Sequence, residues 1–345
     1  MSPAASTTET PVPRSVAWWL FVCCGFVLLM VTLGGVTRLT QSGLSMVEWQ
    51  PLSLLPPSSE ADWQDAFARY QQSPEYRLKN AGMSLDGFKE IFWLEYIHRL
   101  GGRMIGVVFL GPFLWFLVRR RIGGILGWKL AGLFLLGGAQ GVMGWLMVKS
   151  GLADRPDVSQ YRLTIHLGLA LLIYGFLLWT ALGLLHSQQR PVPAAMAWLA
   201  RGLWGVLGLI VVTVLSGGFV AGLDAGLAYN TFPLMNGELV PDGLLVMEPW
   251  FVNLFENMTT VQFQHRLLAM IILGAVFLLW GRGRRILPLP VRTAMTLCAV
   301  MAGIQVSLGI LTLLWEVPIP LAAAHQVGAF MLFTLGLVTA HLLRR

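Results

Sequence analysis

The segment EYIHRLGGRMIGVVFLGPFLWFLV, residues 95–118, begins with a glutamate, a histidine and an arginine and continues as a largely apolar run. A helix of about 20 apolar residues is long enough to cross the roughly 30 Å hydrocarbon core of a bilayer. The segment therefore predicts a membrane span with a polar cluster near one end.

The composition of the whole chain agrees with a membrane protein. Hydrophobic residues make up 56% of its 345 residues and charged residues only 12%, against about 25% charged residues in soluble domains. The net charge of +7 does not indicate nucleic-acid binding, because most basic residues stand in short clusters beside apolar segments. Cys23, Cys24 and Cys298 lie inside apolar stretches, which predicts small buried side chains rather than a disulfide framework or a metal site.

Further apolar runs bring the predicted number of spans to eight. They cover residues 16–37, 92–118, 124–148, 162–185, 200–222, 260–280, 291–314 and 321–342. Arg-rich connections at 119–124, 186–193 and 281–290 are predicted to be cytoplasmic, which places both termini in the cytoplasm. The predicted fold class is an all-α polytopic membrane protein.

The connections between spans divide the chain into two halves. The predicted parts are a cytoplasmic tail 1–15, a first four-helix bundle 16–185 with an outer loop 38–91, a cytoplasmic linker 186–199, and a second four-helix bundle 200–345 with an outer loop 223–259. Within the first outer loop, the sequence after Ser59 predicts an amphipathic helix lying on the membrane surface.

An internal repeat relates the two halves. Four segments recur in the same order: 31–43 with 212–226, EYIHRL (95–100) with QFQHRL (262–267), 138–146 with 303–311, and 164–172 with 323–332. Because each half has an even number of spans, both repeats cross the membrane in the same direction. The predicted architecture is two bundles related by a pseudo-twofold axis along the membrane normal.

Four of the six histidines fall at matching repeat positions, namely His98, His166, His265 and His325. Each is predicted near the outer end of an even-numbered span, so His98 can face His166 and His265 can face His325 at one membrane depth. Facing imidazoles in a helix bundle are typical of axial haem ligation. A zinc site would need further ligands nearby, and a proton relay would not require pairs at equal depth.

Polar neighbours of two histidines differ between the halves. Arg99 and Arg266 follow their histidines and could bind haem propionates, although phospholipid headgroups are an alternative. Glu95 stands opposite Gln262 in the repeat, three residues before the histidine. A carboxylate beside only one haem predicts a reactive site in the first half and a supporting site in the second, whereas an i,i+4 ion pair with Arg99 is the structural alternative.

Long motifs in the chain resemble those of the haem A synthase family, of the alphaproteobacterial and mitochondrial type. They are GGVTRLTQSGLSMVEWQPLSLLPP (34–57), FWLEYIHRLGGRMIG (92–106), GAQGVMGWLMVKSGL (138–152), AGLDAGLAYNTFPLMNG (221–237), QFQHRL (262–267) and AAAHQVGAF (322–330). The resemblance covers nearly the whole chain. Gram-positive members carry a cysteine pair in the first outer loop, and this chain has no cysteine between Thr40 and Lys89.

The resemblance implies roles for the predicted site residues. His265 and His325 would ligate a haem b cofactor, His98 and His166 would hold the substrate haem O, and Glu95 would be the essential carboxylate. The implied reaction oxidises one haem methyl group to a formyl group by successive hydroxylations.

The resemblance also implies partners and a location. A farnesyltransferase would supply haem O, a ferredoxin-like donor would supply electrons, and the chain would form a homo-oligomer. It would lie in the bacterial inner membrane with its haem sites toward the periplasm.

Two other functions are compatible with the residues themselves. A dihaem cytochrome b would carry electrons across the membrane, although its haems would normally lie near opposite faces. A transporter built from repeats could use the histidines and Glu95 as a proton relay, and it would bind no pigment.

Overall fold

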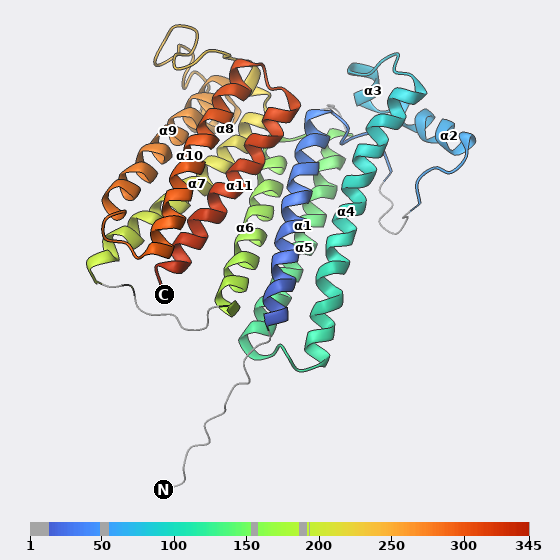
Figure 1. The fold of residues 1–345 in the computed structure, drawn as a ribbon. Helices are drawn as coiled ribbons and strands as arrows, with labels where there is room; N and C mark the ends of the chain where they lie inside the picture. Colours follow the sequence, from blue (N-terminus) through green and yellow to red (C-terminus); the bar gives the residue numbers. More distant parts are fainter. Residues whose placement is uncertain (1–13, 49–54, 153–157, 186–191, 193, 345) are drawn as a thin grey trace.

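A computed structural model describes residues 14–48, 55–152, 158–185, 192 and 194–344, and this part of the chain is helical (Figure 1). Among these described residues, eight helices are long and apolar enough to cross a membrane. They are α1 (Arg14–Leu39), α4 (Leu85–Val118), α5 (Gly124–Gly151), α6 (Gln160–Leu185), α7 (Ala197–Gly222), α9 (Met258–Gly283), α10 (Leu289–Leu314) and α11 (Ile319–Leu342). Each overlaps a predicted span, so the prediction of an all-α multi-pass membrane protein is confirmed. Most of the predicted tail 1–15 and half of the predicted linker 186–199 fall outside the described residues.

Helix α4 begins seven residues before its predicted span. Ser84 caps the helix by accepting a hydrogen bond from a backbone N–H of the first turn. The added turns carry Phe88, which is buried in an aromatic cluster with Tyr70 and with Phe92, the first residue of the predicted span. These turns lie outside the apolar run, so contacts with the outer segments stabilise them and hydropathy does not reveal them.

The long helices form two groups of four with the same neighbour relations (Figure 1). In the first group α1 and α5 each contact both α4 and α6, and in the second α7 and α10 each contact both α9 and α11. The groups meet where α1 contacts α11 and where α6 contacts α7 and α11. The repeated order agrees with the sequence repeat, and the pseudo-twofold axis itself stays a prediction.

Glycines at repeat-related positions allow the two groups to approach closely. A Cβ atom on Gly35 of α1 would lie 2.1 Å from Gln326 Oε1 of α11, and Gln326 Nε2 donates to the Val31 carbonyl at 3.0 Å. A Cβ atom on Gly218 of α7 would lie 2.7 Å from Thr164 Oγ1 of α6. Small residues of this kind let membrane helices approach closely and bond across the contact.

The segment between α1 and α4, predicted to lie outside and called the first outer segment below, contains the helix predicted after Ser59, which is α2 (Glu60–Gln71). Ser59 Oγ accepts from the Asp62 N–H, and the Asp62 carboxylate accepts from the Ser59 N–H, which completes a capping box. The backbone N–H groups of Ser59 and Ser58 lower the pKa of Asp62. Trp63 packs against Phe92 of α4, so α2 is attached to the outer end of that helix. Contact of α2 with a membrane stays a prediction.

Short helices and asparagine side chains shape the other outer segments. Helix α3 (Pro74–Leu78) follows α2, and α8 (Asn253–Glu256) precedes α9. Asn253 Nδ2 donates to the Met247 carbonyl at 2.7 Å, and Asn257 caps α9 by accepting from the N–H of Thr259. These contacts fix the outer connection directly before α9.

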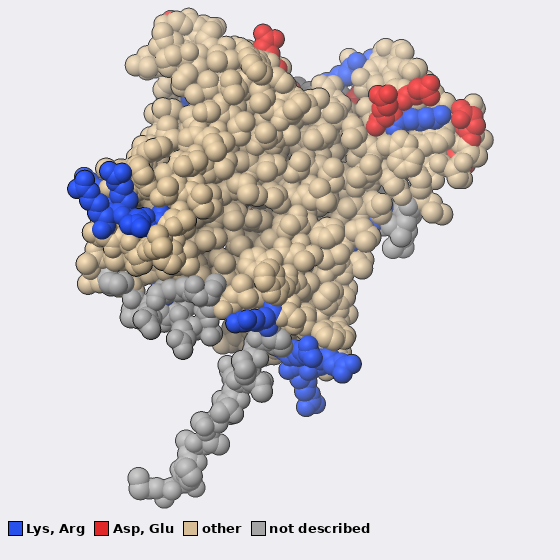
Figure 2. Space-filling model, in the orientation of Figure 1, with Lys and Arg blue, Asp and Glu red and all other residues tan. Residues whose placement is uncertain are grey.

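Charge is distributed unevenly between the two ends of the molecule. Figure 2 shows clusters of Lys and Arg toward the end where α1 begins and α11 ends, and acidic side chains gathered near α2 and α3 at the opposite end. Basic residues are enriched on the cytoplasmic side of membrane proteins. The distribution favours the predicted orientation with α2 and α3 outside.

Candidate functional site

His265 of α9 and His325 of α11 face each other inside the second helix group. Their ring centroids lie 6.4 Å apart and the ring planes are inclined by 79°. Imidazole nitrogens bind transition metals at about 2.0–2.1 Å, so two imidazoles in line on one metal have centroids roughly 6 Å apart. The pair therefore has the spacing that axial ligation of one iron requires.

His98 of α4 and His166 of α6 occupy the corresponding places in the first group. As in the second group, the histidines come from the second and fourth long helices, and the remaining two helices flank them. The structure thus shows ring contact between His265 and His325, and the pairing of His98 with His166 stays a prediction.

A glycine on the first helix of each group accommodates a histidine ring. A Cβ atom on Gly34 of α1 would lie 3.0 Å from His98 Cε1, and one on Gly217 of α7 would lie 3.1 Å from His265 Cε1. These glycines match in the repeat. A larger residue at either position would displace the ring, so the glycines belong to the site.

The third helix of each group contributes an equivalent glycine. A Cβ atom on Gly144 of α5 would lie 3.3 Å from His166 Cε1, and one on Gly309 of α10 would lie 2.8 Å from His325 Cε1. Sequence reasoning missed all four glycines as site residues. Their recurrence within the repeated segments was the available signal.

Glu95 is buried, with 2% of its surface exposed, and both of its carboxylate oxygens accept hydrogen bonds. Its Oε2 accepts from Ser45 Oγ and from the Met46 N–H, both at 2.7 Å. Its Oε1 accepts from Arg99 Nη2 at 2.6 Å. The ion pair that sequence reasoning treated as the structural alternative is therefore present, and it lies in the interior rather than at an exposed surface.

Gln262, the repeat counterpart of Glu95, donates hydrogen bonds to the segment between α7 and α9, whereas Glu95 accepts them from the segment between α1 and α4. Its Nε2 donates to the carbonyls of Ala225 at 2.8 Å and Tyr229 at 3.2 Å, and its Oε1 accepts from Arg266 Nη2. Glu95 meets donors, whereas Gln262 meets carbonyl oxygens. The difference between the two residues thus matches the groups that each outer segment presents.

Both predicted propionate-binding arginines bind the outer segments. Arg99 donates to the carbonyls of Met46 at 2.8 Å and Glu48 at 3.0 Å. Arg266 donates to the carbonyls of Tyr229 at 2.7 Å and Thr231 at 2.8 Å. Arg266 Nε is buried and has no hydrogen-bond partner among the described residues, so this arginine keeps one donor for an acidic ligand.

The donor set fits a metal that brings its own in-plane ligands. Among the described residues, no group of three or more His, Cys, Asp or Glu side chains could hold a bare metal ion. A porphyrin supplies four nitrogens to its iron and needs only the axial positions from the protein. The facing pair His265 and His325 meets this requirement, and the same glycine contacts recur at His98 and His166.

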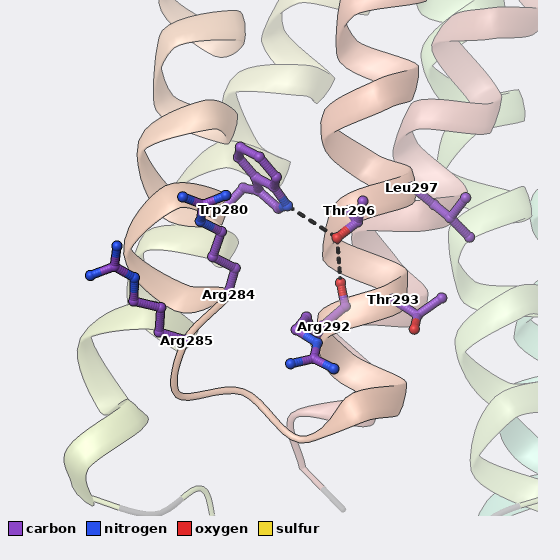
Figure 3. A pocket seen from close by; sticks show the side chains of 7 residues that line it. All are labelled: Trp280, Arg284, Arg285, Arg292, Thr293, Thr296 and Leu297. Carbon is purple, nitrogen blue, oxygen red and sulfur yellow. Dashed lines mark hydrogen bonds between the residues drawn. The ribbon is translucent and has the colours of Figure 1, made fainter.

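A surface pocket of about 580 Å³ lies away from the histidines (Figure 3). It is lined by Trp280, Arg284, Arg285, Arg292, Thr293, Thr296 and Leu297. Trp280 is 15 residues along α9 from His265, a distance of roughly 22 Å in a helix. The pocket thus belongs to the opposite end of the second group.

Comparisons with known proteins agree with the arrangement of the site. Residues 17–337 match the family model COX15-CtaA, described as cytochrome oxidase assembly protein. A protein named Heme A synthase from Nitrosospira multiformis is 52% identical over 99% of this chain and 97% of its own length. A protein of the same name from Paramagnetospirillum magneticum is 53% identical over 96% of this chain and 94% of its own length.

Proposed function

The chain belongs to the cytochrome oxidase assembly protein family, and from this we propose that it is a haem A synthase. It oxidises a methyl group of haem O to a formyl group and so produces haem A for cytochrome oxidase. The observation that carries the proposal within the molecule is the facing pair His265 and His325, whose centroid separation of 6.4 Å suits one axially ligated iron. Family membership supplies the identity of the substrate.

We assign the two histidine pairs to two haems. His265 and His325 hold haem b, and Arg266, with its unused buried Nε, binds a propionate of that haem. His98 and His166 hold haem O. When bound, haem b supplies a redox-active iron that exchanges electrons with the substrate site.

Glu95 and Arg99 serve the substrate side. Ser45, Met46 and Arg99 fix the Glu95 carboxylate, so its oxygens keep a constant position beside the His98 turn of α4. In this role the carboxylate accepts a proton that the methyl oxidation releases. Arg99 both holds Glu95 and neutralises acidic groups of the incoming haem.

The surroundings of the reaction follow from the same proposal. The chain lies in the bacterial inner membrane with both termini in the cytoplasm and its haem sites toward the periplasm, as the charge distribution supports (Figure 2). A farnesyltransferase supplies haem O, a ferredoxin-like protein supplies electrons, and the chain works as a homo-oligomer.

Haem extraction from cells tests the proposed reaction. Cells that make haem O but lack their own haem A synthase should accumulate haem A when they express this chain. Cells with the empty vector provide the control. A purified protein that carries haem in its reduced-minus-oxidised spectrum while its cells contain only haem O would favour the electron-carrier alternative.

A further inference from the structure

The four histidines differ at the ring nitrogen Nδ1. In the second group, His265 Nδ1 lies 2.8 Å from Ser216 Oγ and His325 Nδ1 lies 3.1 Å from Gln305 Nε2. In the first group, the Nδ1 atoms of His98 and His166 are buried and have no hydrogen-bond partner among the described residues. The two sites thus share the glycine contacts to the histidine rings and differ in the hydrogen-bond partners of Nδ1.

Ser216 has a defined counterpart in the first group. Gly34 and Gly217 make the same contact with a histidine Cε1, so the residues directly before them, Leu33 and Ser216, are equivalent. Leucine offers no hydrogen-bond acceptor. The difference between Ser216 and Leu33 therefore explains why Nδ1 of His265 has a hydrogen-bond partner and Nδ1 of His98 has none among the described residues.

The direction of the Ser216 hydrogen bond is determined by a third group. Ser216 Oγ donates its only hydrogen to the Thr213 carbonyl at 2.8 Å. The oxygen must therefore accept from His265, which puts the ring proton on Nδ1 and leaves the lone pair of Nε2 available for a metal.

The glutamines make the same contact with the histidine backbone in both halves, and only Gln305 also lies within hydrogen-bond distance of a ring nitrogen, His325 Nδ1. Gln140 Nε2 donates to the His166 carbonyl at 3.0 Å, and Gln305 Nε2 donates to the His325 carbonyl at 2.8 Å. Each fixes the backbone of a histidine. The amide nitrogen of Gln305 can only donate, so His325 Nδ1 accepts in that contact. The Ser216 contact is therefore the one that places a ring proton on Nδ1.

We propose that Ser216 is a positioning residue that makes the second haem site retentive, while the first site, with Leu33 in its place, releases its haem. Hydrogen-bond partners on the outer nitrogen of a metal-ligating histidine orient the ring and raise its basicity, and their removal typically lowers metal affinity about 10–100-fold. A cofactor must stay bound, whereas a substrate must enter and leave. This inference rests on the proposed function, because that function makes one haem a cofactor and the other a substrate.

Haem loss from purified full-length protein tests the role of Ser216. His98 and His166 are both replaced by alanine, so that only the second site is followed, and haem transfer to excess apomyoglobin is timed with and without Ser216→Ala. We expect about 10-fold faster loss, the lower end of the range that such partners give. The midpoint potential of the bound haem should also shift.

Two variants separate the hydroxyl contact from general stability. Ser216→Thr keeps the hydroxyl and should restore slow haem loss. Thr339→Val removes a buried hydroxyl on α11 that bonds only within its own helix, to the Leu335 carbonyl, and should lose haem at the parent rate. An unchanged rate and potential for Ser216→Ala would overturn the proposal.

The reverse substitution keeps the test decisive if Ser216→Ala does not accumulate. With His265 and His325 replaced by alanine, Leu33→Ser should slow haem loss from the first site, and an unchanged rate would overturn the proposal. The proposed function is read separately, from haem A in cells. Cells with wild-type protein but no haem A, together with faster loss from Ser216→Ala protein, would refute the function and leave the role of Ser216 standing.

Discussion

Replacing Glu95 by glutamine, the residue found at its repeat position, distinguishes an anchoring role from a chemical one. The carboxylate accepts hydrogen bonds from Ser45, Met46 and Arg99, all of which are donors. An amide has one acceptor oxygen, so its NH2 group must face at least one of these donors. Arg99, whose side chain is 10% exposed, also loses the Glu95 carboxylate as its ion-pair partner.

The expected cost follows from these contacts. A hydrogen bond to a charged group contributes about 1.5–3 kcal/mol, and removing one partner of a buried ion pair costs about 3–5 kcal/mol. We expect Glu95→Gln to lower the free energy of unfolding by about 3–5 kcal/mol. A lower thermal midpoint and faster hydrogen exchange around Ser45 and Met46 should report this loss.

The chemical role is measured per molecule of folded protein. If Glu95 takes part in the oxidation, the ratio of haem A to haem O should fall by roughly 10²-fold or more at equal amounts of folded protein. The matched control is Gln262→Glu, which brings a carboxylate against the carbonyls of Ala225 and Tyr229 and should destabilise the second half similarly. An unchanged thermal midpoint for Glu95→Gln would refute the anchoring argument, and an unchanged haem ratio would refute the catalytic role.

Three further predictions concern the second haem site and α2. Gly217→Ala brings a methyl group within 3.1 Å of His265 Cε1 and should lower haem b content, whereas Gly25→Ala, with nothing within 4 Å, should not. His265→Ala should abolish the b-type signal in a reduced-minus-oxidised spectrum, and an unchanged spectrum removes His265 from the ligand set. The pKa of Asp62 is lowered by backbone N–H groups, so its stabilisation of α2 is fully present above the unfolded pKa of about 4 and is lost as the pH falls through the folded pKa. Hydrogen-exchange protection of α2 should therefore drop only below about pH 4, and the Asp62→Asn variant should lack this step.

The sequence predicted the spans and the histidine pairs because both depend on simple periodic constraints. An apolar run of bilayer length must be helical, since no water is available to bind its backbone groups. The repeat then placed His98 and His166 at one depth in one half and His265 and His325 at one depth in the other. The assignment of His98 to His166 and of His265 to His325 followed from the order of the spans alone.

Contacts that depend on irregular segments could not be predicted in this way. Arg99 binds carbonyls of Met46 and Glu48, about 50 positions earlier, in a connection that has no periodic pattern. The fit of Gly34 against the His98 ring depends on the distance between two helix axes, which the alignment of repeats does not contain. Both contacts depend on how segments distant in the sequence pack together, which local sequence preferences do not reveal.

The two halves differ at Glu95 and Gln262 and again at Leu33 and Ser216, and only the second difference lacks a structural compensation. The first is balanced by the outer segments, which offer donors to the glutamate and carbonyls to the glutamine. The difference between Leu33 and Ser216 has no such counterpart, because the adjacent glycines contact the histidine rings in nearly the same way. A Cβ atom on Gly34 or Gly217 would lie 3.0 or 3.1 Å from the Cε1 atom of the ring. A hydroxyl that appears in one of two equal cradles acts on the ring alone, and through Nε2 on the iron that the ring would bind. Ser216 is therefore the residue that we propose distinguishes the site that retains its haem from the site that exchanges it.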